Sequence, residues 1–159
     1  MAKVLLARPL PEAVVTRAQA LFDVTVRAET TPLSGTEMRA ALADYDAVMP
    51  TLGDLFRAEV FADVPGARCK LLANFGVGFN HIDAAAAVAA GIAVTNTPGA
   101  VTDATADIAM TLMLMSARRA SEGERMVRAG AWEGWHPTQM LGLHLSGKTV
   151  GIIGMGRIG

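Results

Sequence analysis

The chain has 159 residues, of which 52% are apolar and 18% are charged, and its formal net charge is −1. That length and polarity suit one well-packed domain, or one small domain with part of another, and they exclude an intrinsically disordered chain. The balanced charge, with scattered Lys and Arg residues, offers no basic surface for nucleic acid and no polybasic membrane anchor. We therefore expect a globular protein that binds neither nucleic acid nor membranes.

Cysteine use and the amino-terminal sequence both predict a cytoplasmic protein. The single cysteine, Cys69, can form no internal disulfide and lies in an apolar run, where a small buried side chain is expected. The amino-terminal sequence contains only four consecutive apolar residues, which are too few for a signal-peptide core. The longest apolar stretch, 108–117, is half as long as a membrane span and suits a buried helix.

Strand-like and helix-like segments alternate over residues 1–100. Strands are expected at 3–8, 24–28, 46–50, 69–75 and 92–96. Helices are expected at 11–22, 35–45, 54–62 and 83–90. The apolar face of the first helix comprises Val14, Ala18, Leu21 and Phe22, and the second helix begins at a capping box, Ser34–Glu37. This alternation predicts an α/β fold, a flavodoxin-like doubly wound parallel sheet with helices on both faces.

The sequence over 101–159 predicts the start of a second domain. A helix over 102–119 is apolar almost all round and is expected to be buried between layers, and helical sequence continues over 122–128. Residues 129–147 contain Gly, Pro and two Trp without periodicity, which predicts an ordered connecting arm. A strand expected over 149–154 then leads into a glycine-rich turn.

The glycine-rich turn, Gly154-Met155-Gly156-Arg157-Ile158-Gly159, has the G-x-G-x-x-G pattern of a dinucleotide-binding loop. Glycines at these positions allow a tight turn and let a pyrophosphate approach the backbone at the start of the next helix. The pattern alone is weak because glycine-rich turns are common, and the preceding strand strengthens it. We expect this segment to be the first strand and glycine loop of a Rossmann coenzyme domain.

A second glycine pair, Gly76-Val77-Gly78, follows the strand expected at 69–75. It lies at the carboxyl end of a parallel strand, where doubly wound sheets bind ligands, and its consecutive amides can hold an anion such as a carboxylate. The same spacing also fits a tight turn without a ligand. His81 has no carboxylate or second ligand nearby in the sequence, so a surface or helix-capping role is expected rather than catalysis.

Four segments together resemble the D-isomer-specific 2-hydroxyacid dehydrogenases, and among these the glyoxylate and hydroxypyruvate reductases. They are ANFGVGFNHID, GIAVTNTPGAVTDATADIAM, GAWEGWHPTQMLG and GKTVGIIGMGRIG. The resemblance is specific over 69–159, where the motifs keep their order and spacing, and only topological over 1–68. It implies a substrate domain over 1–100 and an enzyme that uses NADP or NAD to reduce a small 2-oxo acid, glyoxylate or hydroxypyruvate, to the D-2-hydroxy acid.

The resemblance also implies roles for particular residues. The amides of Val77 and Gly78 would hold the substrate carboxylate, and Asn80 stands where many relatives carry Asp. Pyrophosphate binding is implied for Gly154, Gly156, Arg157, Ile158 and Gly159. Thr105 would lie near the cofactor, and it fits equally well as a first-turn residue of its helix.

The connecting arm implies a homodimer. In the reductase branch an aromatic residue of this segment reaches into the active site of the partner subunit, and Trp135 matches it better than Trp132. A tryptophan packed in the dimer interface without substrate contact fits the same pattern. In either case the helix and arm over 103–145 are expected to form the dimer contact.

The catalytic Arg, His and acidic residue implied by the resemblance lie after the glycine loop, so none is assigned among residues 1–159. His136 and His144 precede that loop and cannot replace the catalytic His, and no metal site is expected. We therefore expect the 159-residue chain alone to be inactive in hydride transfer. Two other functions remain open, a corepressor-like binding module that senses a dinucleotide and a non-functional fragment.

Overall fold

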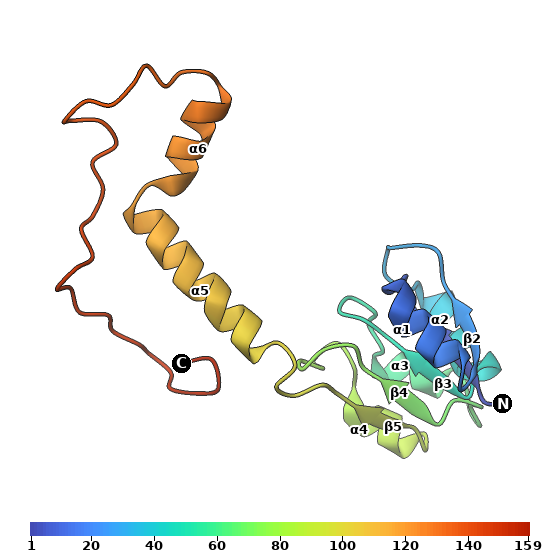
Figure 1. Ribbon diagram of the computed structural model, residues 1–159. Helices are drawn as coiled ribbons and strands as arrows, with labels where there is room; N and C mark the ends of the chain where they lie inside the picture. Colours follow the sequence, from blue (N-terminus) through green and yellow to red (C-terminus); the bar gives the residue numbers. More distant parts are fainter. The chain divides into compact units, whose positions relative to one another are not determined.

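The computed structural model describes all 159 residues, and the chain divides into two compact units, Met1–Ala100 and Val101–Gly159. The first unit contains every strand of the protein and four of its helices. The second unit contains two helices followed by a long segment without regular secondary structure (Figure 1).

The first unit is built on a single five-stranded parallel sheet. Its strands are β1 (Lys3–Leu6), β2 (Asp23–Val26), β3 (Ala47–Met49), β4 (Leu71–Ala73) and β5 (Ala93–Thr95). They lie in the order β2-β1-β3-β4-β5, and in the central register Val4 pairs with both Val24 and Ala47. This order is that of flavodoxin-like doubly wound domains, so the fold class expected from the alternating sequence is confirmed.

Four helices connect the strands, α1 (Glu12–Gln19), α2 (Gly35–Asp44), α3 (Ala58–Ala62) and α4 (Ala84–Ala89). α3 contacts both α2 and α4, so these three helices lie side by side. Right-handed crossovers place α1 on the opposite face of the sheet, because the chain reverses direction across the sheet after β2. The sheet is therefore covered mainly on the face that carries α2, α3 and α4.

The hydrophobic core lies between the sheet and these three helices. Its large and almost fully buried side chains are Leu42, Val48, Phe56, Leu72 and Ile92. Burial of each such side chain stabilises the fold by about 1.5–3 kcal/mol. Cys69 is also fully buried, as expected, and burial raises the pKa of its thiol.

The apolar face expected for the first helix is not buried. No residue of α1 is buried, and Val14, Leu21 and Phe22 are exposed. The main contact of α1 is with the edge strand β2, which is too narrow a surface to cover the helix. The periodic pattern was thus sufficient to predict the helix, whereas its burial depends on how much sheet lies beneath it.

The capping box expected at α2 is present. The Ser34 hydroxyl accepts a hydrogen bond from the Glu37 amide at 3.2 Å, and the Glu37 carboxylate accepts one from the Ser34 amide at 2.8 Å. Arg27 Nε also donates to the Glu37 carboxylate, at 2.9 Å. The Glu37 carboxylate accepts hydrogen bonds from the Ser34 amide, the Ser34 hydroxyl and Arg27, and these, in that order of effect, lower the pKa of Glu37 to about 2.

The second unit begins with α5 (Thr102–Ala117) and α6 (Ala120–Arg128), which are separated by Arg118 and Arg119, and Arg119 has a left-handed conformation with φ of 55°. The expectation that the first of these helices is buried between layers is wrong for this chain, because no residue of α5 is buried. Its exposed large apolar side chains include Ile108, Met110, Leu112 and Leu114. A helix that is apolar all round is buried only when other elements surround it, and the second unit itself supplies no element that buries α5.

Residues 129–159 form neither helix nor strand, so the strand expected over 149–154 is absent from the structure. Ile152 and Ile153 are exposed. A strand needs a neighbouring strand for its backbone hydrogen bonds, and the second unit contains no other strand. None of the helices has the length and hydropathy that crossing a lipid bilayer would require.

Candidate functional site

Two loops meet at the carboxyl edge of the sheet in the first unit. One follows β3 and covers 50–56, and the other follows β4 and covers 74–82. The Phe75 amide donates to the Pro50 carbonyl at 2.9 Å, and isolated bridges join Thr51 to Phe75 and Phe56 to Ile82. The two loops are therefore continuations of neighbouring parallel strands, which brings their backbones to one edge.

The 50–56 loop is held by a fully buried carboxylate, Asp54. It accepts hydrogen bonds from the amides of Leu33 at 2.8 Å and Thr51 at 2.7 Å, and from the Thr51 hydroxyl at 3.1 Å. The Arg8 guanidinium lies 3.9 Å from the same carboxylate and donates to the Leu52 carbonyl at 3.2 Å. With its oxygens engaged in this way, Asp54 has a structural role in fixing the loop.

The 74–82 loop is organised around a second buried polar side chain, Asn74, which is 2% exposed. Its Nδ2 atom donates to the carbonyl oxygens of Gly76 at 3.0 Å and Gly78 at 2.9 Å. Its Oδ1 atom lies 3.0 Å from Nε2 of His81, which is also buried. The surface or helix-capping role expected for His81 is therefore wrong, because the ring packs beneath the glycine loop as a hydrogen-bond partner.

The carbonyl of Val77, between the two glycines, is also occupied. It accepts a hydrogen bond from Nδ2 of Asn96, which directly follows β5, at 2.9 Å. In contrast, the amides of Val77 and Gly78 donate to no acceptor in the protein. The structure thus places the two residues predicted to bind a carboxylate in a loop whose carbonyls are paired and whose amides are available. Such an arrangement of successive amides suits a small anion.

A cavity of about 250 Å³ borders this loop. Its lining includes Phe79 from the loop, Ala84 from α4, and Val94, Thr95 and Asn96 at the end of β5. Asn96 is thus shared between the cavity wall and the hydrogen bond to the Val77 carbonyl. A space of this volume can accommodate an organic acid of a few heavy atoms.

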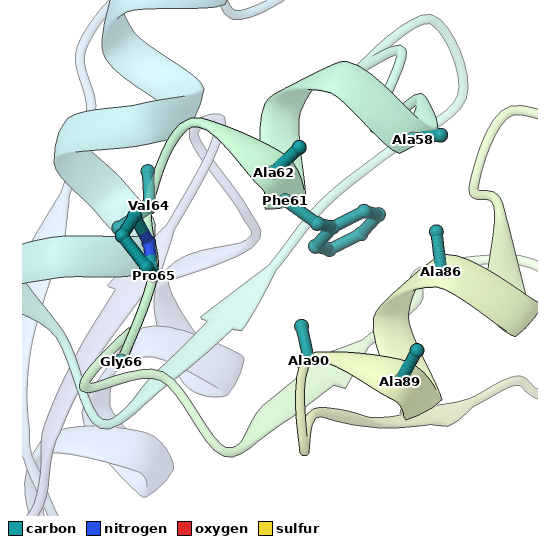
Figure 2. A pocket seen from close by; sticks show the side chains of 9 residues that line it. All are labelled: Ala58, Phe61, Ala62, Val64, Pro65, Gly66, Ala86, Ala89 and Ala90. Atoms are coloured by element: carbon teal, nitrogen blue, oxygen red, sulfur yellow. The ribbon is translucent and has the colours of Figure 1, made fainter.

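A second, larger groove of about 490 Å³ lies between α3 and α4 and shares no residue with the glycine loop (Figure 2). Short apolar side chains line it, and the ring of Phe61 extends from α3 toward α4. No charged or hydrogen-bonding side chain is among its lining residues. It therefore offers no chemistry of its own. No cluster of three or more His, Cys, Asp or Glu residues that could hold a metal ion is present.

The remaining predicted site residues belong to the second unit, and no hydrogen bond or ion pair joins them to one another. Thr105 donates its hydroxyl to the Val101 carbonyl at 2.7 Å, within the first turn of α5. Trp135 is 80% exposed in the arm. The glycine-loop residues Gly154, Gly156, Arg157, Ile158 and Gly159 are all exposed.

Asn74, Asn96 and Asp54 are the residues of this edge that the sequence patterns did not single out. Each follows a parallel strand directly or within one short loop. A polar residue just after a predicted strand is therefore the sequence feature that could have identified them. Their partners include backbone atoms that lie from 2 to 21 residues away and the side chain of His81, and no periodic pattern in the sequence indicates such pairs. These buried hydrogen bonds therefore emerge only from the folded structure.

The doubly wound parallel sheet, with a loop at its carboxyl edge whose Val77 and Gly78 amides have no acceptor in the protein, defines the class of this protein as α/β. Residues 4–150 match the family described as "D-isomer specific 2-hydroxyacid dehydrogenase, catalytic domain", and the chain belongs to this family. The resemblance identified from the four sequence segments is thereby confirmed.

Named relatives are similar over nearly the whole chain. A protein named "Glycerate dehydrogenase" from Hyphomicrobium methylovorum is 43% identical over 99% of the chain and 48% of its own length. A protein named "Glyoxylate reductase" from Korarchaeum cryptofilum is 39% identical over 99% of the chain and 47% of its own length. The chain thus spans about half the length of the relatives it matches.

Solved structures give the same result. A putative D-isomer specific 2-hydroxyacid dehydrogenase, NAD-binding, from Polaromonas sp. JS6 66 matches with a TM-score of 0.92 and 39% identity, over 99% of this chain and 49% of that one. An NADPH-dependent glyoxylate/hydroxypyruvate reductase from Sinorhizobium meliloti, in complex with NADP and malonate, matches with a TM-score of 0.74 and 30% identity, over 99% of this chain and 47% of that one.

Proposed function

We propose that the chain is the amino-terminal portion of an NAD(P)-dependent oxidoreductase that reduces glyoxylate or hydroxypyruvate to the D-2-hydroxy acid by hydride transfer. The observation that carries this proposal is the pair of available amides at Val77 and Gly78, at the carboxyl edge of the sheet, in a chain of the 2-hydroxyacid dehydrogenase family. Relatives named glyoxylate reductase and glycerate dehydrogenase support the choice of a small 2-oxo acid as substrate.

The two amides bind the substrate through its carboxylate. Hydrogen bonds from uncharged N–H groups to a carboxylate are charge-assisted, and each contributes about 1.5–3 kcal/mol. A carboxylate held at two points fixes the orientation of the 2-oxo group attached to it, which is a requirement for transfer of hydride to one face. Residues 1–100 act in this proposal as the substrate-binding domain.

The cofactor is NADP or NAD, and residues 101–159 supply the start of its domain. The fit of the glycine loop is partial. Gly154 has φ of 98°, a conformation suited to glycine, and no large side chain hinders approach at Gly154, Gly156 or Gly159. However, a pyrophosphate site also needs the first turn of a helix after the loop, and residues 154–159 form no helical turn. Residues 101–159 therefore do not form a complete cofactor site, and no hydride-transfer step is derived from them.

A homodimer in the cytoplasm completes the proposal. The exposed apolar side chains of α5, with the arm after α6, form the contact with a second copy over 103–145. In that dimer Trp135 either reaches the active site of the partner or packs in the interface between the subunits. An exposure of 80% for so large a side chain is consistent with a role in covering a partner surface.

The test measures the oxidation of NADH and of NADPH in the presence of glyoxylate or hydroxypyruvate. The readout is the fall in absorbance of the reduced cofactor. The complete gene product is assayed beside the 159-residue chain. We expect turnover only from the complete product. Glyoxylate gives the achiral glycolate, so chiral analysis applies to the product from hydroxypyruvate, which is expected to be the D-2-hydroxy acid. Turnover by the 159-residue chain above background, or none by the complete product with either acid, would contradict the proposal.

A further inference from the structure

The glycine loop is held by two asparagine side chains that end neighbouring strands. Asn74 follows β4 and binds the carbonyls of Gly76 and Gly78, while Asn96 follows β5 and binds the carbonyl of Val77. The carbonyls of three successive peptide units are therefore fixed by side-chain amides. The backbone amide of Thr97 adds a second hydrogen bond to the Gly76 carbonyl, at 3.1 Å.

Fixing a carbonyl also fixes the amide that shares its peptide unit. A trans peptide unit is planar, with its C=O and N–H pointing in opposite directions, and the chain has no cis peptide bond. The Gly76 carbonyl shares a unit with the Val77 amide, and the Val77 carbonyl shares one with the Gly78 amide. Asn74 thus directs the amide of Val77, and Asn96 directs the amide of Gly78.

We propose that Asn74 and Asn96 are positioning residues, which aim the amides of Val77 and Gly78 at the carboxylate of the 2-oxo acid. This inference rests on the proposed function, because it takes that carboxylate as the ligand. Each asparagine acts through a backbone unit. Removal of the Asn96 side chain frees the Val77 carbonyl to rotate toward the ligand, and a carbonyl oxygen repels a carboxylate. Removal of the Asn74 side chain leaves the Gly76 carbonyl with only the Thr97 hydrogen bond and leaves the Gly78 carbonyl unpaired.

His81 fixes the direction in which the Asn74 amide faces. Both hydrogens of Nδ2 are used by the two glycine carbonyls, so Oδ1 can only accept. The Nε2 atom of His81, 3.0 Å from Oδ1, is therefore the ring nitrogen that carries the hydrogen. With the amide reversed, the Asn74 oxygen would face two carbonyl oxygens and its NH₂ group would face the His81 N–H.

The first test needs no ligand. Amide chemical shifts and hydrogen-exchange rates are compared by NMR among the wild-type 159-residue chain, Asn74→Ala and Asn96→Ala. We expect Asn74→Ala to change the amides of Val77 and Phe79, which share peptide units with the Gly76 and Gly78 carbonyls. We expect Asn96→Ala to change mainly the Gly78 amide, with the amides of β1 unchanged. Because Asn96 is exposed, its replacement is expected to leave the core intact even if Asn74→Ala does not fold. Loop amides that do not respond to Asn96→Ala would overturn the proposal.

The second test adds oxamate, a small anion with a carbonyl beside its carboxylate. We expect Asn74→Ala and Asn96→Ala each to weaken oxamate binding about tenfold, the loss typical of misplacing one hydrogen bond to a charged group. His81→Gln keeps a donor near the Nε2 position and is expected to bind oxamate as the wild type does, whereas His81→Leu is expected to bind more weakly. Rescue by Gln is a result that a purely space-filling role for His81 would not give.

The two proposals can fail separately. If both asparagine variants bind oxamate as tightly as the wild type, the positioning role is wrong and the carboxylate site stands. If oxamate leaves the wild-type Val77 and Gly78 amides unchanged, the carboxylate site is wrong, and the ligand-free comparison still decides whether the asparagines direct the two amides.

Discussion

His81 and Asn74 form a buried hydrogen-bonded pair, with Nε2 of the ring 3.0 Å from the side-chain oxygen of the amide. Burial lowers the pKa of His81, with the charge of Asp54 opposing this effect and that of Arg57 adding to it. The folded protein thus binds fewer protons here than the unfolded chain, in which the histidine pKa is about 6.5. This contribution to stability is complete above that pKa and is lost as the pH falls through the lowered one.

We therefore expect the free energy of unfolding, measured by urea denaturation, to fall as the pH is lowered below about 6.5. His81→Gln should remove this component of the pH dependence. The matched control is His144→Gln, because His144 is exposed, and it should keep the wild-type dependence. An identical pH dependence in His81→Gln and in wild type would show that the buried ring is not its source.

The capping box at α2 gives a second prediction. Ser34→Ala removes both the cap on the Glu37 amide and the hydroxyl hydrogen bond to the Glu37 carboxylate, and should lower the free energy of unfolding by about 1 kcal/mol. NMR titration should show the pKa of Glu37 rising from about 2 toward its ordinary range. Ser121→Ala, at an exposed position of α6, is the control and should change neither quantity.

Loss of the Asp54 carboxylate is expected to be costly. In Asp54→Asn an NH₂ group would face backbone amides that now donate to Asp54. Each unsatisfied buried group costs about 1–3 kcal/mol, so urea denaturation should show a loss of that size or more. Asp44→Asn, at an exposed position of α2, should change stability by less than about 0.5 kcal/mol. Equal effects of the two substitutions would contradict the structural role of Asp54.

The apolar side chains of α5 predict self-association. If α5 forms the dimer contact, Leu112→Lys should place a charge in the interface and shift sedimentation equilibrium toward the monomer. Val88→Lys introduces the same charge at an exposed site of α4 and should leave the association constant unchanged. A wild-type chain that sediments as a monomer at all concentrations would contradict the homodimer.

Local sequence patterns were sufficient to predict the order of strands and helices in the first unit, because apolar runs and glycine-containing turns alternate regularly there. The Ser34–Glu37 cap and the buried Cys69 were predictable for the same reason, since each depends on neighbours in the chain. The placement of Val77 and Gly78 at the carboxyl edge followed from the strand that precedes them.

What could not be predicted depends on partners distant in the sequence. His81 was expected at the surface because its partner, the Asn74 amide, lies seven residues away and on the other side of the glycine loop. The exposure of α1 and α5 depends on how much surface the fold provides to cover them. The strand expected over 149–154 needs a neighbouring strand, and its own residues carry no information on whether one is present.

The most direct test of the carboxylate site compares oxamate with oxamide, its neutral counterpart, in NMR titrations of the wild-type 159-residue chain. The two ligands have nearly the same shape, so a difference between them reports the carboxylate. We predict saturable shifts of the Val77 and Gly78 amides with oxamate and none with oxamide. Equal shifts with both ligands, or shifts confined to other residues, would contradict the assignment of this loop as the site that binds the substrate carboxylate.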